Sequence, residues 1–199
     1  MKLLRKLTLL IAIPLIVAGC SSVPQKKSYT LTTDTSTIVQ SNNALPSLMV
    51  SQVKSLGRLS TDMTYSRSAN EIETYTQSDW ITPPTQLIQA AITQNLEARN
   101  IFQYVIMAPN SVTATNRLDI TILDMNQIFT NDKQNHIVLK LQARLINNSN
   151  NKILKTFTYD ITEPGSAYNA EAGVKAYNKA LNEIASSLAA DVTQTLRGY

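Results

Sequence analysis

The chain has 199 residues, of which 43% are hydrophobic and 16% are charged, and its formal net charge is +4. This length is enough for one domain with a substantial core. With one histidine and one cysteine, a metal site would need carboxylates alone, and the absence of clustered Lys and Arg gives little support to nucleic-acid binding.

The first 20 residues are typical of a bacterial export signal. Three basic residues precede an apolar run of about 11 residues, and small residues follow it. As a helix rising about 1.5 Å per residue, this run is too short to cross a hydrocarbon core about 30 Å thick. The sequence Val17-Ala18-Gly19-Cys20 resembles the lipobox of bacterial lipoproteins. In that motif the signal is cut before the cysteine, the thiol receives diacylglycerol and the new amino group is acylated.

We therefore expect residues 1–19 to be a cleaved signal peptide and Cys20 to be the lipid attachment site. A triacylated cysteine gives a stable anchor, whereas one acyl chain holds a protein only marginally. Ser21 stands where an Asp would resemble an inner-membrane retention signal, so we expect the periplasmic face of the outer membrane. The alternative is an ordinary secreted protein with an unmodified cysteine. Cleavage removes three of the 18 Lys and Arg residues and none of the 14 Asp and Glu residues, which leaves a net charge of +1.

The N-terminal half of the mature chain predicts a tether followed by short elements. Residues 20–28 form the lipidated cysteine and a polar tether, in which Lys26-Lys27 either touches anionic headgroups or is simply solvated. Residues 29–199 form a single domain. Alternation of apolar and polar residues predicts a strand at 29–33 and a second strand within 47–59, marked by Leu48, Val50 and, after a slip, Val53. Turn signals and apolar spacing further predict a loop at 34–46, a hairpin of 63–66 with 71–75, a helix at 85–99 after Pro83-Pro84, and a strand from 102.

The C-terminal half predicts three long strands and a long helix. The strands cover residues 118–129, 137–145 and 153–161, and they should form an antiparallel meander with one wet face. From residue 170 to 196, apolar residues recur at spacings of three and four, which predicts one long amphipathic helix. The order of elements favours an α+β fold, a two-layer sandwich of a mainly antiparallel sheet with two helices packed on one face.

Motifs along nearly the whole mature chain resemble one family. They are Tyr29-Thr30-Leu31, Leu48-Met49-Val50-Ser51-Gln52-Val53, Met63-Thr64-Tyr65, Tyr75, Trp80-Ile81-Thr82-Pro83-Pro84, Leu87, Leu96, Leu118-Asp119-Ile120, Val138-Leu139-Lys140-Leu141, Ala143 and Val174-Lys175-Ala176-Tyr177. The chain resembles the auxiliary lipoproteins of ABC-type transporters, the PqiC-like group. Ile81 departs from the pattern, since many relatives carry a small residue after the tryptophan.

The resemblance implies a periplasmic, outer-membrane-anchored subunit of an intermembrane lipid transport system. Its implied partners are an MCE-domain substrate-binding protein and, through that protein, an inner-membrane permease. A homo-oligomer is also compatible with this role, because a lipid conduit needs a wall. The main alternative is a structural lipoprotein that supports assembly of an outer-membrane or secretion complex, and a weaker one is an envelope hydrolase.

Catalytic and cofactor motifs find little support. His136 is the only histidine and follows a polar turn, no G-x-S-x-G elbow occurs, and the mature chain has four glycines, so no glycine-rich phosphate cradle forms. Glu71 and Glu73 share one side of a strand, where they could act as an acid–base pair or be two solvated carboxylates. We expect no enzyme activity, no metal and no cofactor beyond the lipid on Cys20.

The best candidates for partner binding are Trp80, Pro83 and Pro84, together with Tyr65. Tryptophan and tyrosine are favoured as interface anchors, and adjacent prolines hold a rigid surface. The alternative is that Trp80 fills the corner between the sheet and the first helix. Similarly, the apolar stripes of the two helices form either the core or a lipid-binding groove.

Overall fold

The computed structural model describes residues 25–36, 44–130, 132 and 134–198. The predicted signal peptide and Cys20 lie outside these residues. In chain order the described residues form β1 (Lys27–Tyr29), β2 (Leu48–Val50), β3 (Lys54–Ser55), β4 (Asp62–Ser68), β5 (Glu71–Trp80), α1 (Pro84–Ala98), β6 (Val105–Met107), β7 (Asn116–Phe129), β8 (Asn135–Asn147), β9 (Lys152–Pro164) and α2 (Ala170–Arg197).

The sheet is organised around β7. On one side, β7 pairs antiparallel with β8 along its whole length, and β8 pairs antiparallel with β9. On its other side, β7 pairs in turn with the short parallel strands β2, β3 and β4. The β4–β5 hairpin, to which β1 adds in parallel, and β6 beside β2 complete the sheet. The long pairings are antiparallel and the parallel ones are short, so the predicted α+β sandwich is confirmed.

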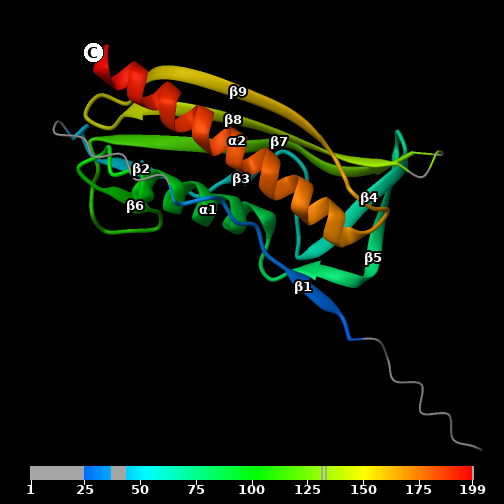
Figure 1. Cartoon of the computed structure of the whole chain (residues 1–199). Coiled ribbons are helices and arrows are strands. Elements are labelled where there is room, and N and C mark those ends of the chain that lie inside the picture. The colour runs from blue at the N-terminus through cyan, green and yellow to red at the C-terminus, as the bar shows by residue number, and fades with distance from the viewer. Residues whose placement is uncertain (1–24, 37–43, 131, 133, 199) are drawn as a thin grey trace, which may run out of the picture.

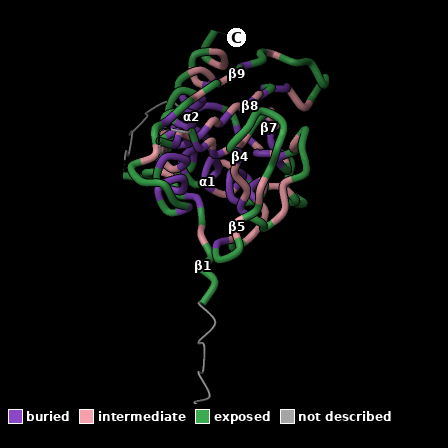
Figure 2. Tube along the Cα trace, turned by 90° about the vertical axis from the view of Figure 1, so that its right-hand side faces the viewer, coloured by how far each residue is buried: buried purple, intermediate pink, exposed green. Residues whose placement is uncertain are grey.

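Both helices cover one face of this sheet (Figure 1). The helix α2 packs on β8 and β9, and α1 packs on β2 and β6. Buried residues gather between the helices and the sheet (Figure 2). The predicted apolar stripes point into this layer: Leu87, Ile88, Ala91, Ile92 and Leu96 of α1, and Val174, Tyr177, Leu181, Ile184, Leu188 and Val192 of α2, are buried.

The strand predicted within residues 47–59, marked by Leu48, Val50 and, after a slip, Val53, is two short strands, β2 and β3. Val50 and Val53 are both buried. Because side chains of a strand alternate between its faces, residues three apart cannot both face the core from one regular strand. The chain therefore leaves the ladder after Val50 and rejoins β7 at Lys54.

The predicted strand at 29–33 is shifted, because the chain leaves the sheet after Tyr29. From there it runs between the two helices, where Leu31 is buried in the core. The Thr32 N–H donates to Oδ1 of Asn178 on α2 at 3.0 Å, and the Thr33 hydroxyl donates to the Ala91 carbonyl on α1 at 2.9 Å. The entering chain is thus held by both helices.

Candidate partner-binding surface

The candidate catalytic side chains are not brought together. His136 lies on the half-exposed face of β8, where it pairs in register with Ile128 and Pro164. Glu73 accepts hydrogen bonds from Tyr65 and Arg67 and so has its own structural partners. Among the residues that the structure describes, no group of three or more His, Cys, Asp and Glu could hold a metal ion.

The two prolines set the start of α1. Pro83 occupies the N-cap position, and its carbonyl accepts from the N–H groups of Gln86 and Leu87 at 2.9 and 3.3 Å. Pro84 is the first helical residue, where a missing N–H costs nothing. Pro84 is buried and Pro83 is half-buried. The pair therefore fixes the direction in which the chain leaves β5.

Trp80, at the end of β5, is only 5% exposed. Its ring meets the ring of Tyr177 on α2 edge to face, with centroids 6.0 Å apart. A side chain this buried offers little surface to a partner, which favours the corner-filling role that the sequence left open. Ile81, the next residue, is 64% exposed, and its N–H donates to the Tyr29 carbonyl of β1.

Tyr65 belongs to an aromatic cluster beside the β4–β5 hairpin. This hairpin aromatic cluster consists of Tyr65, Tyr75, Phe129 and Tyr168. The Tyr65 ring lies 4.6 Å from that of Tyr75 and 5.2 Å from that of Phe129, while Tyr168 packs on Phe129 at 4.0 Å. Tyr168 is 44% exposed, so the cluster reaches from the core to the surface.

Two charged side chains cover the cluster. The Tyr65 hydroxyl donates to Glu73 Oε2 at 2.8 Å, and Arg67 donates to the same oxygen at 3.0 Å. The Arg67 guanidinium also lies 5.0 Å from the centre of the Tyr65 ring, within the range of a cation–π contact. The hydrogen bond to Glu73 raises the pKa of Tyr65. These contacts hold Tyr65 in one position before any partner arrives.

A buried polar network supports the cluster from beneath. The Tyr75 hydroxyl donates to the side-chain oxygen of Gln127, which is fully buried on β7. The Gln127 amide in turn donates to Asn135 Oδ1 and to the Asn169 carbonyl, each at 3.0 Å. Asn169 caps α2 by accepting from the Ala172 N–H at 2.9 Å. The network therefore links the hairpin, the sheet and the start of α2.

Sequence reasoning missed this network and the role of Tyr168. One local signal could have identified Asn169 as the N-cap of α2. Asn169 directly precedes a run with helical apolar spacing, and Glu171 lies in the first turn, a combination typical of a helix start. Nothing local indicated that Gln127 would face the core. Figure 1 places the hairpin, β1 and the start of α2 at one end of the domain and the C-terminus at the other. In the described part of the chain, no helix has the length and apolar character needed to span a membrane.

Solved structures share this fold. Protein XCC0632 from Xanthomonas campestris has a TM-score of 0.72 at 18% identity, with 86% of this chain and 98% of that one covered. An uncharacterised protein has a TM-score of 0.64 at 14% identity, covering 84% and 99%. The hypothetical protein CT253 from Chlamydia trachomatis has a TM-score of 0.51 at 10% identity, covering 78% and 100%. These likenesses concern the fold alone.

The comparison with curated proteins finds no match. A family model, described as the ABC-type transport auxiliary lipoprotein component, matches residues 29–189. That range begins with the last residue of β1 and ends within α2. It contains the corner at Trp80, the hairpin aromatic cluster and the polar network. The chain therefore belongs to the family of ABC-type transport auxiliary lipoprotein components.

Proposed function

We propose that this chain is a lipid-anchored, non-catalytic periplasmic subunit of an intermembrane lipid transport system of the MCE or Pqi type. In this role it docks the transport assembly at the outer membrane. The observation that carries the proposal is the family match over residues 29–189, which begins nine residues after a lipobox-like Cys20. The proposed partners are an MCE-domain protein and, through it, an inner-membrane permease.

In this proposal, a short tether keeps the domain close to the anchoring membrane. Because β1 begins at Lys27, six residues, 21–26, separate it from Cys20. At no more than about 3.6 Å per residue, the seven steps from Cys20 to Lys27 span at most about 25 Å. Beyond β1, Thr32 and Thr33 are held by hydrogen bonds to α2 and α1, so these residues do not lengthen the tether. A transport partner must therefore approach a domain that stays near the membrane surface.

The hairpin aromatic cluster, with Arg67, is the proposed docking surface. Tyrosine and arginine are enriched among the residues that dominate binding energy, and Tyr65 is already fixed by Glu73 and Arg67. Trp80, Pro83 and Pro84 support this role indirectly, because they set the angle between β5 and α1. Ile81 is the exposed residue of that corner.

The test is purification of the protein from native membranes, followed by mass spectrometry of its N-terminus and of the proteins that co-purify. The proposal expects an acylated Cys20 at the N-terminus and an MCE-domain protein among the partners. Cys20→Ala should leave the chain unlipidated and outside the outer-membrane fraction. If a secretin or an outer-membrane barrel co-purifies instead, the protein serves assembly and the transport proposal is wrong.

A further inference from the structure

An open groove of about 670 Å³ lies where α1 and α2 end, between their carboxyl-terminal turns. Figure 1 places this end of α2 away from β1. The apolar part of its lining, referred to as its floor, consists of Ile101, Ala189 and Ala190, while Thr193, Gln194 and Gly198 also line the groove. Ligand sites in proteins commonly have volumes of about 300–1,000 Å³, so the groove is large enough for part of a lipid.

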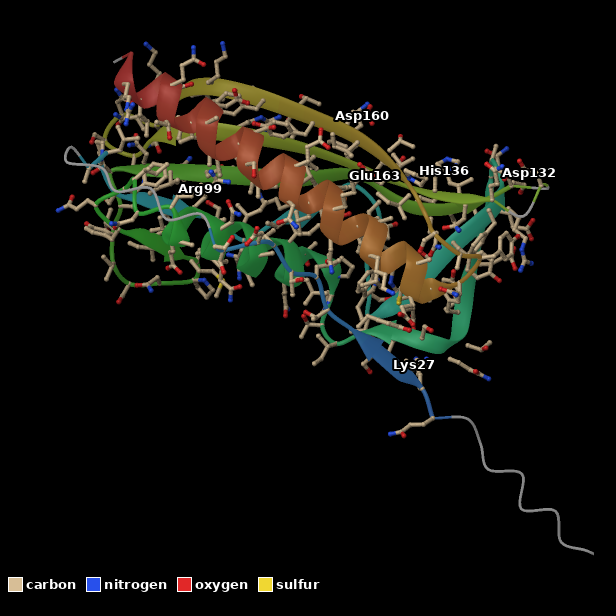
Figure 3. All side chains as sticks on the ribbon, in the orientation of Figure 1. Lys27, Arg99, Asp132, His136, Asp160 and Glu163 are labelled. Atoms are coloured by element: carbon tan, nitrogen blue, oxygen red, sulfur yellow. The ribbon has the colours of Figure 1, made fainter. Side chains whose placement is uncertain are left out.

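Two arginines border this apolar floor. Arg99, at the end of α1, donates to Oδ1 of Asn95 and to the hydroxyl of Ser186 on α2, each at 2.9 Å. Its guanidinium is therefore fixed between the two helices (Figure 3). Arg197, in the last turn of α2, supplies the second positive charge. Arginine presents a planar set of donors that matches the oxygens of a phosphate.

No acidic side chain among the described residues lines the groove. Asp191, which is on the same helix, is bound by the Tyr159 hydroxyl of β9 and lines a neighbouring depression, which shares Gln194 and Gly198 with the groove. The carboxyl ends of α1 and α2 each carry about half a negative charge. Arg99 and Arg197 oppose these partial negative charges with two positive ones.

We propose that this groove binds a lipid with an anionic phosphate headgroup, with an acyl chain on the apolar floor and the phosphate between Arg99 and Arg197. The biological source of the lipid rests on the proposed transport function. The helix α2 is about 42 Å long at 1.5 Å per residue over its 28 residues. The groove and β1 are at opposite ends of the domain (Figure 1), so the groove lies far from the point where the chain enters the fold from its proposed anchor.

The test uses the lipidated protein in a nonionic detergent. Binding of fluorescent phosphatidylglycerol is compared with that of phosphatidylcholine carrying the same chains, and inorganic phosphate is added as a competitor. We expect phosphatidylglycerol to bind more tightly than phosphatidylcholine, and Arg197→Gln and Arg99→Gln together to weaken it by about tenfold or more. Ala190→Trp should block the floor. The matched control is Arg144→Gln, which removes the same charge from the exposed opposite face of β8.

Equal binding of the two lipids, or unchanged binding by the double variant, would overturn the site. If inorganic phosphate displaces the lipid at equal concentration, the groove is a simple anion site and the lipid assignment is wrong. Arg197 is exposed, so Arg197→Gln alone keeps the test valid if Arg99→Gln disturbs the contact between the helices. Wild-type protein that co-purifies with the MCE-domain partner but binds no lipid would disprove this inference and leave the proposed function standing.

Discussion

The Tyr159 hydroxyl on β9 donates a 2.8 Å hydrogen bond to Oδ2 of Asp191 on α2. This bond ties the last strand of the meander to the long helix that covers it. Burial raises the pKa of Tyr159, and the hydrogen bond and the negative charge of Asp191 raise it further. Deprotonated Tyr159 would be a buried, poorly hydrated anion beside the carboxylate of Asp191. The folded protein therefore favours the protonated form of Tyr159.

Stability should therefore fall in alkali. Burial also raises the pKa values of Tyr75 and Tyr177. The folded chain thus binds these three protons more tightly than the unfolded chain, whose tyrosines titrate near pH 10. Their contribution is fully present below about pH 10 and is lost as the pH rises further.

The measurement is the free energy of unfolding in urea, determined at several pH values between about 8 and 11. Tyr159→Phe should lower stability by about 1–2 kcal/mol at neutral pH, because Asp191 loses a donor, and should flatten the alkaline decline. Tyr104→Phe is the control, since Tyr104 is 42% exposed. A wild-type curve that stays level above pH 10 would contradict this account.

Gly173→Ala should destabilise the protein although alanine favours helices. An added Cβ at Gly173 would overlap the side-chain amide of Gln127. That amide cannot move aside, because hydrogen bonds to Tyr75, Asn135 and Asn169 hold it. Overpacking of this kind costs about 1–3 kcal/mol, which exceeds the gain of about 1 kcal/mol in helix propensity.

Thermal and urea unfolding of the Gly173→Ala variant would measure this loss. Gly198→Ala is the matched control, because a Cβ there meets only ordinary contacts at 3.6 Å. We expect the control to unfold within about 0.5 kcal/mol of the wild type. Equal stability of both variants would mean that the Gln127 network is looser than its geometry indicates.

The elements predicted best are those with long, regular periodicity. In β8 the residues at odd positions from Ile137 to Leu145 are buried, while Lys140 and Arg144 lie on the other face, as alternation predicts. The stripe of α2 is buried from Val174 to Val192. In such elements the apolar residues alone determine which face is buried, so the local sequence is sufficient to predict the element and its orientation.

The short parallel strands could not be predicted, because their pairing depends on distant residues. Leu48 to Val50 of β2 lie between β6 and β7, whose sequences come more than 50 residues later. The path after Tyr29 is another case, since it depends on Asn178 and Ala91 from two helices. No local sequence pattern indicates these strand pairings or these hydrogen bonds to the helices.

The candidate site was predicted in part. The sequence singled out Tyr65 and Trp80 by residue type, but residue type does not distinguish an exposed anchor from a buried plug. Tyr168 was not found, because it lies in a connection where nothing indicates that its ring packs on Phe129. The cluster forms only when β4, β5, β7 and the β9–α2 connection meet, which is a property of the topology.

Trp80→Ala should act through stability rather than through partner contact. Its ring is buried against Tyr177, and loss of a buried tryptophan costs about 3–5 kcal/mol. Trp80→Phe should lose less, because an aromatic ring remains. Ile81→Ser, at the exposed neighbour, should change the free energy of unfolding by no more than about 0.5 kcal/mol. A Trp80→Ala protein with wild-type stability and lost partner binding would show that the tryptophan is a direct contact.

Truncation of the exposed part of the hairpin aromatic cluster should weaken partner binding without unfolding the domain. Tyr168→Ala and Arg67→Ala each remove a side chain that faces solvent and lies on a fixed aromatic surface. Residues of this kind at the centre of an interface contribute about 2 kcal/mol or more, which corresponds to a loss in affinity of more than tenfold. The measurement is the dissociation constant for the co-purified MCE-domain protein, alongside a thermal melt that checks folding.

Tyr104→Ala is the matched control, because Tyr104 is 42% exposed against 44% for Tyr168 and directly precedes β6, away from the hairpin (Figure 1). Equal losses for Tyr104→Ala and Tyr168→Ala, or no loss for either cluster variant, would place the docking surface elsewhere on the domain.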